Sequence, residues 1–147
     1  MTSSSASVPK AIPKAEPVPT PTTQPFWDAA RQGELHLQHC VKCNQHVFYP
    51  RPHCPQCGST ELVWERASGR GRLYSYVINH VAPPGWAGDV PYVLAVVQLE
   101  EGPRMLSNLV GVAPDPEKLP LDMELEVSFV ERGAQKLPVF GPVGSAA

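Results

Sequence analysis

Long apolar runs, a strong net charge and catalytic signature motifs are all missing from this 147-residue sequence. No apolar run approaches the ~18 residues that a membrane helix requires, which predicts that the chain is not an integral membrane protein. Charged residues make up only 18% of the chain and the formal net charge is −2, so a nucleic-acid-binding surface is not indicated. The sequence also contains no G-x-S-x-G elbow, no phosphate-binding loop and no H-E-x-x-H motif, so it offers no recognisable enzymatic centre.

Proline is in excess, with 18 residues, and six of them lie in the first 25 positions. Proline at such short intervals favours extended polyproline II structure. We therefore predict that residues 1–24 are a disordered leader, with a partner-wrapping arm as the alternative. The two lysines of this segment are not followed by the apolar stretch of about 7–15 residues that marks a secretory signal, which predicts a cytoplasmic location.

All four cysteines of the chain fall into one motif, C-x2-C-x10-C-x2-C, formed by Cys40, Cys43, Cys54 and Cys57. In a reducing compartment such cysteines bind metal rather than form disulfides. Each C-x2-C pair lets one tight turn direct two sulfurs toward a single ion, and two such turns complete a tetrahedral Zn²⁺ site. A closed four-sulfur shell has no open position for substrate. The motif therefore predicts one structural zinc ion that stabilises the fold.

Other interpretations of the cysteine motif stay open at this point. CPQCG also suits iron in a rubredoxin-like electron carrier, and redox-active or disulfide-bonded cysteines are a further alternative. His39, His46 and His53 lie near the motif. With four thiolates already present, we expect these histidines at the surface or, for His46 and His53, donating an N–H to a sulfur.

The elements around the motif indicate a mainly β protein. A short N-terminal helix is predicted within residues 25–35, because Pro25 and Asp28 suit its first turn and Gly33 suits its end. Two turns are too few to be stable alone, so Phe26 and Trp27 must dock on this chain or on a partner. The predicted zinc ribbon covers residues 36–62 and includes short strands at 35–39 and 46–49.

Alternating apolar and polar residues predict a five-stranded OB-fold barrel over residues 63–142, followed by a flexible tail at 143–147. The expected strands are 62–66 and 72–80, taken together as one strand interrupted by a glycine pair, then 92–100, 104–110, 123–131 and 136–140. Gly69 and Gly71 indicate a bulge, with an RNA contact as the weaker interpretation of GRGR. Pro138 predicts that the last strand is an edge strand.

The longest loop of the predicted barrel, residues 81–91, carries Trp86 among prolines and glycines. This side chain is expected either to fold back as a lid or to contact a ligand or subunit. The loop between the first two long strands of an OB barrel often borders the binding face. His80 stands at the base of the loop and has either a structural or a functional role.

Several of these patterns, taken in order, resemble a known family. They run from Phe26 to Val130 and comprise the Phe-Trp helix, Gly33-x-Leu35, CVKC and CPQC with Pro50-Arg51 between them, Ser68-Gly69-Arg70-Gly71, Tyr74, Tyr76, Val77, His80, Pro91-Tyr92, Gly102 and Leu109-Val110-Gly111. Their order and spacing resemble those of the zinc-ribbon plus OB-fold proteins that accompany acyl-CoA enzymes. The chain departs from that family at Asp122, where glycine is usual, and in its proline-rich leader.

The resemblance implies a non-catalytic accessory subunit of a heteromeric thiolase-like complex that makes or breaks carbon–carbon bonds in acyl-CoA substrates. Its members pair with thiolases, thiolase-like aldolases, acyltransferases or hydroxymethylglutaryl-CoA synthases and help to build the path of the CoA moiety. The partner supplies the nucleophile or general base, and this chain supplies interface. The expected partner contacts are Phe26, Trp27 and Trp86. The expected CoA contacts are Arg51, Arg66 and Arg70, whose guanidinium groups suit phosphate, together with His80.

Two other functions stay open on the sequence. An OB barrel is compatible with a single-strand nucleic-acid-binding protein, which predicts strongly salt-dependent binding. However, residues 26–80 carry six Lys/Arg and four Asp/Glu, whereas residues 81–147 carry four and nine, so the predicted barrel is acidic. The third function is the iron-containing electron carrier mentioned above.

Overall fold

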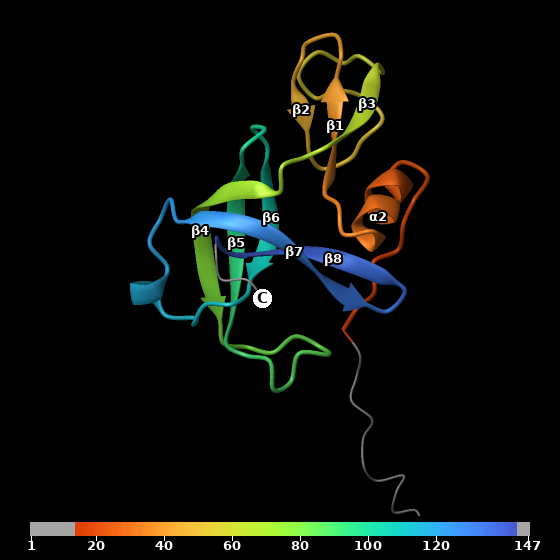
Figure 1. Ribbon diagram of the computed structural model, residues 1–147. Coiled ribbons are helices and arrows are strands. Elements are labelled where there is room, and N and C mark those ends of the chain that lie inside the picture. Colours follow the sequence, from red (N-terminus) through yellow and green to blue (C-terminus); the bar gives the residue numbers. More distant parts are fainter. Residues whose placement is uncertain (1–13, 144–147) are drawn as a thin grey trace, which may run out of the picture.

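The chain folds into a three-stranded ribbon joined to a closed five-stranded barrel, with one short helix packed beside both (Figure 1). The computed structural model describes residues 14–143. This mainly β architecture confirms the fold predicted from the sequence. Within the described residues, no helix is both long and apolar enough to cross a membrane.

The ribbon sheet has the strand order β2-β1-β3, with β1 at its centre. Its strands are β1 (His36–Cys40), β2 (His46–Val47) and β3 (Leu62–Arg66), and both neighbours run antiparallel to β1. The buried side chains of β1 belong to two different clusters. Leu37 belongs to the main core that continues into the barrel. Cys40 belongs to a small separate cluster at the two C-x2-C turns, which we call the knuckles. Strand β1 therefore links the cysteine cluster to the barrel.

The barrel closes in the order β4-β5-β6-β8-β7. Its strands are β4 (Arg70–Asn79), β5 (Tyr92–Leu99), β6 (Arg104–Leu109), β7 (Glu124–Arg132) and β8 (Gln135–Pro142), and a short 3-10 helix, η1 (Pro116–Lys118), precedes β7. Alternate residues of β5 and β6 point inward, as the period of two requires. The fully buried interior contains Leu73, Val93, Val97, Leu125 and Phe140.

Two details of the barrel differ from the sequence-based prediction. The irregularity in β4 lies between Leu73 and Ser75, not at Gly69 and Gly71. The last strand is not an edge strand, because β8 pairs with β7 along its whole length and with β6 through the bridge of Leu109 and Phe140. Pro138 is tolerated because that bridge lies two residues away, and its carbonyl accepts a hydrogen bond from Ser107 Oγ at 2.9 Å.

Gly71 is required by close approach between neighbouring strands, since a Cβ at this position would lie 2.7 Å from the carbonyl oxygen of Gln98 and 2.7 Å from Val97 Cγ1. A backbone oxygen in a paired strand cannot move away. We expect Gly71→Ala to lower the free energy of unfolding by about 1–3 kcal/mol, as overpacking does. Urea unfolding measures this change. Ser75→Ala, at an exposed position of the same strand, is the control, and equal midpoints for the two variants would contradict the prediction.

The helix α2 (Gln24–Arg31) is shorter than the predicted segment 25–35 and ends two residues before Gly33. Of the predicted leader, residues 1–13 lie outside the described residues, as do residues 144–147 of the predicted tail. Residues 14–23 make defined contacts with the barrel: Lys14 pairs with Asp89, and Glu16 accepts a hydrogen bond from Ala134. This part of the leader is therefore packed on the fold rather than detached from it.

Candidate metal centre

The two C-x2-C turns have the same backbone hydrogen bonds. In the first, Cys40 N–H donates to Gln45 O and Asn44 N–H donates to Cys40 O, both at 2.8 Å. In the second, Cys54 N–H donates to Ser59 O and Gly58 N–H donates to Cys54 O, again at 2.8 Å. The fifth residue of each turn has a positive φ, 63° at Asn44 and 77° at Gly58. The repeated turn explains why each pair of sulfurs points to one side of its loop.

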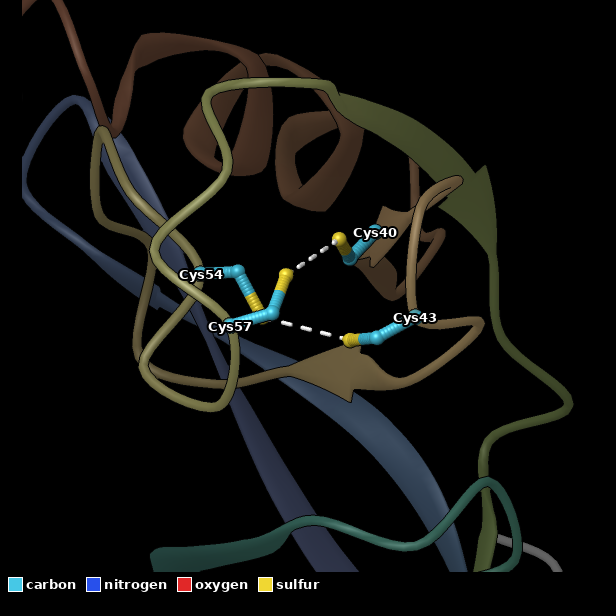
Figure 2. A group of neighbouring side chains, drawn as sticks. All are labelled: Cys40, Cys43, Cys54 and Cys57. Carbon is cyan, nitrogen blue, oxygen red and sulfur yellow. Dashed lines mark hydrogen bonds between the residues drawn. The ribbon is translucent and has the colours of Figure 1, made fainter.

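The four sulfurs converge on one point between the turns (Figure 2). All Sγ atoms lie within 4.8 Å of one another, with 3.6 Å between Cys40 and Cys57 and 3.5 Å between Cys43 and Cys54. A tetrahedral zinc ion with Zn–S bonds of about 2.3 Å separates its sulfurs by about 3.8 Å. These separations fit one zinc ion with four thiolate ligands. They are far longer than a disulfide bond, and the four cysteines are free.

The backbone of the knuckles favours the thiolate form at two of the ligands. Hydrogen bonds from backbone N–H groups, chiefly that of Cys43, lower the pKa of Cys40. Burial acts to raise the pKa of Cys54, but hydrogen bonds from the N–H groups of Cys57 and Gln56, together with those from the Cys43 and Cys57 side chains, bring the pKa to about 7. Burial raises the pKa of Cys43 to about 12. A cation is what allows all four sulfurs to be deprotonated together, since metal ions displace thiol protons.

Two of the three histidines near the cysteines are engaged elsewhere. Glu65 lies between two of them, with its carboxylate oxygens 3.1 Å from His39 Nδ1 and 3.2 Å from His46 Nε2. His39 Nε2 also lies 2.7 Å from Asn44 Oδ1. His46 therefore directs its Nε2 to a carboxylate rather than to a sulfur, and His53 is exposed. The candidate metal centre consists of the four cysteines alone.

The two aromatic residues of α2 have different environments. Phe26 is 5% exposed and packs against Trp27 and Phe48, with ring centroids 4.9 and 5.7 Å apart, so it belongs to the core of this chain. Trp27 is half-buried and lines an apolar groove of about 260 Å³ between α2, the chain after β2, and the barrel. Sequence reasoning missed this groove because its walls come from distant segments. Its lining residues are Thr23, Phe26, Trp27, Phe48, Tyr49, Pro50, Met105, Leu106, Leu137 and Pro138.

The third candidate partner contact, Trp86, is folded back onto the barrel. Its ring lies 4.4 Å from that of Tyr92, and Lys14 Nζ lies 4.0 Å from its centroid. The sequence left open whether Trp86 folds back or contacts a ligand or subunit, and in the structure it is folded back. Figure 1 shows the loop that carries Trp86 at the end of the barrel opposite the ribbon.

The four candidate CoA contacts do not come together in one site. Arg70 begins β4 and His80 follows its end, so this ten-residue strand separates them by about 30 Å. Arg66 ends β3 and pairs with Glu34 at 3.6 Å. A hydrogen bond from His36 and the charge of Arg66 lower the pKa of Glu34. Arg51 is exposed beside Pro50 of the apolar groove, and its backbone N–H donates to Gln38 Oε1 at 2.8 Å.

Comparison with known proteins matches both parts of the fold. Residues 27–63 match the model of the rubredoxin-like zinc ribbon domain of ChsH2, and residues 64–130 match the model of its C-terminal OB-fold domain. The ribbon match, together with the clustered cysteines, supports one structural zinc ion per chain. Among solved structures, the Ltp2-ChsH2(DUF35) aldolase is 38% identical with a TM-score of 0.75, covering 86% of this chain and 98% of the other.

Curated relatives carry the same region. A DUF35 domain-containing scaffold protein of Methanothermobacter thermautotrophicus is 34% identical over 75% of this chain and 82% of its own length. A benzoylsuccinyl-CoA thiolase subunit, BbsA of Thauera aromatica, is 31% identical over 68% and 67%. A probable enoyl-CoA hydratase alpha subunit of Thermomonospora curvata is 42% identical over 80% of this chain, which spans only 36% of that subunit. The chain therefore belongs to the family of DUF35 proteins, with the zinc ribbon and OB fold of ChsH2.

Proposed function

We propose that this chain is a non-catalytic, zinc-stabilised subunit of a thiolase-like acyl-CoA complex that makes or breaks carbon–carbon bonds. The match that spans 98% of a chain in the Ltp2-ChsH2(DUF35) aldolase carries this proposal. The similarity to a benzoylsuccinyl-CoA thiolase subunit supports it. The chain has only four cysteines, and all four belong to the metal cluster, so none remains to act as a thiolase nucleophile. The catalytic residues therefore come from the partner.

The apolar groove beside α2 is our candidate for the surface that meets the partner. Tyr49 and Leu106 at its walls are 49% and 50% exposed, and Trp27 adds a half-buried aromatic side chain of the kind enriched in binding hot spots. Arg51 adjoins this groove through Pro50, which makes it the best placed of the four candidate CoA contacts. This placement supports the proposed role in assembly and in the CoA path.

Copurification and activity test the proposal. A tagged full-length chain isolated from its native cell extract is expected to retain a thiolase-like protein, and turnover of an acyl-CoA ester by that purified partner is expected to depend on adding this chain. This chain alone is expected to leave the ester unchanged. Full activity of the partner alone, or turnover by this chain alone, would contradict the proposal.

A matched pair of variants tests the groove. Leu106→Arg places a charge on the apolar wall and is expected to weaken binding of the partner at least tenfold in a titration, because the charge is desolvated in the interface. Val77→Arg, at a position 57% exposed on β4 that does not line the groove, is expected to bind like the unaltered chain. Equal affinity of the two variants would assign the interface to another surface.

A further inference from the structure

The described part of the leader is attached to the barrel at two points. Lys14 Nζ lies 2.9 Å from Asp89 Oδ2, and the same ammonium lies 4.0 Å from the centroid of Trp86. Two residues further on, Glu16 Oε2 accepts a hydrogen bond of 3.2 Å from the backbone N–H of Ala134. Residues 14–16 therefore connect the loop of residues 81–91 to the turn between β7 and β8.

The turn between β7 and β8 is shaped to receive Glu16. Gly133 has a φ of 65°, and a Cβ on this residue would overlap the Glu16 carboxylate. The carboxylate thus lies directly against the glycine backbone, where any side chain would displace it. Backbone hydrogen bonds to an ionised carboxylate are stronger than those between neutral groups.

The loop of residues 81–91 has little support of its own. It belongs to no strand, and its internal backbone hydrogen bonds are those of two turns, from Trp86 N–H to Pro83 O at 2.9 Å and from Asp89 N–H to Trp86 O at 2.8 Å. Trp86 is its one large aromatic side chain, and that ring contacts both Tyr92 and Lys14. The leader therefore supplies two of the contacts that hold this loop, the ion pair with Asp89 and the cation–π contact with Trp86.

The loop and the leader border a cavity of about 290 Å³ at the place where β6 and β8 meet, which we call the seam of the barrel. Trp86, Tyr92 and Lys14 line one side of it, and Leu109, Arg132 and Val139 are among the barrel residues on the other. At this seam the backbone ladder between β6 and β8 has a single residue pair, Leu109 and Phe140. The guanidinium of Arg132 lies 5.6 Å from the Trp86 ring, so two cations face one aromatic side chain.

We propose that residues 14–16 are a strap that holds the loop of residues 81–91 against the barrel along one border of this cavity. A ligand or protein that reaches Trp86 from the side of the leader has to displace Lys14 first. The strap precedes residues 27–130, the region that matches the family models, and it acts whether or not the function proposed above is correct. Release of the strap frees the loop of residues 81–91 without unfolding the barrel.

Hydrogen exchange of the full-length protein, resolved to individual amides, tests the strap. Lys14→Met keeps the length of the side chain but removes the ion pair and the cation–π contact, which predicts about three- to tenfold faster exchange at the amides of Trp86 and Asp89. Glu16→Ala is expected to speed exchange at Ala134, whose N–H loses its acceptor. Val18→Ala, at a position 83% exposed in the same segment, is the control and is expected to change neither rate.

A double-mutant cycle ties the effect to the observed contact. Asp89→Asn removes the partner of Lys14 on the loop and is expected to speed exchange by about twofold. The combination Lys14→Met/Asp89→Asn is expected to exchange no faster than Lys14→Met alone, because the shared interaction is already lost. Unchanged exchange of Trp86 and Asp89 in Lys14→Met, unchanged exchange of Ala134 in Glu16→Ala, or effects in the double variant that multiply, would each overturn the proposal.

Discussion

A variant in which serine replaces Cys57 is expected to lose its zinc and to unfold the ribbon. Zinc binding contributes roughly 10–16 kcal/mol of apparent free energy in zinc-finger peptides at neutral pH, and a serine hydroxyl is not deprotonated to replace a thiolate. The cluster around the knuckles has only Cys40, Val47 and Cys54 as buried residues, so little apolar packing holds this region without the metal. The ribbon therefore depends on the ion.

The effect of Cys57→Ser is expected to extend to the barrel. Leu37 of β1 is 1% exposed and belongs to the same buried cluster as Leu73 and Phe140 of the barrel. When β1 loses its order, Leu37 leaves this cluster. We therefore expect a lower Tm for the whole chain in addition to faster exchange of the ribbon amides.

Elemental analysis and thermal unfolding measure these two effects. The unaltered protein is expected to be colourless with one zinc per chain, whereas bound iron would make it red and would support an electron carrier. His53→Ala, at an exposed position next to Cys54, is the matched control and is expected to keep both zinc and Tm. A Cys57→Ser protein with full zinc content and an unchanged Tm would refute a structural role for the metal.

The metal cluster was predictable because it depends on local spacing. Each C-x2-C turn closes through hydrogen bonds within six residues, so the sequence alone defines its shape. The strands were predictable for a related reason, since period-two alternation marks one buried face: β7 was expected at 123–131 and spans Glu124–Arg132. Both inferences used only residues that are neighbours in the chain.

Features that depend on distant residues were misplaced or missed. The Gly69–Gly71 pair suggested a bulge, but Gly71 is required by the carbonyl of Gln98 on β5, a neighbour that the local sequence does not reveal. The actual irregularity lies at Tyr74, a residue type that carries no turn signal. Register against a partner strand decides such positions, and register is a tertiary property.

The leader illustrates the same limit. Its proline content predicts an extended backbone, and residues 14–20 are in no helix or strand. Composition does not predict, however, that Lys14 pairs with Asp89 or that Glu16 accepts a hydrogen bond from Ala134, because both partners are distant in the sequence. The apolar groove beside α2 was missed for this reason as well. Surfaces assembled from several segments require the structure.

Replacement of Phe140 by alanine is expected to be the most damaging substitution in the barrel. Phe140 is 0% exposed and is the residue of β8 through which the barrel closes onto β6, pairing with Leu109. Its carbonyl also accepts a hydrogen bond of 2.8 Å from Val110 N–H. Truncation of a buried phenylalanine costs about 3–5 kcal/mol, from lost burial and from the cavity left behind.

Because Phe140 lies where β8 meets β6, its replacement is expected to have a local effect at this seam that can be measured separately from the loss of overall stability. Because the backbone ladder between β6 and β8 has a single residue pair, supplemented by the hydrogen bond from Ser107 to Pro138, loss of the ring is expected to weaken the seam more than the long β4–β5 or β7–β8 pairings. Denaturant unfolding is expected to show the loss of about 3–5 kcal/mol for Phe140→Ala, and hydrogen exchange is expected to rise first at Val110.

Phe140→Leu, which refills part of the space, is expected to fold with a smaller loss of stability. Leu121→Ala, at a position 63% exposed, is the control and is expected to stay within about 0.5 kcal/mol of the unaltered protein. A Phe140→Ala protein as stable as this control would mean that the seam is held by the backbone alone.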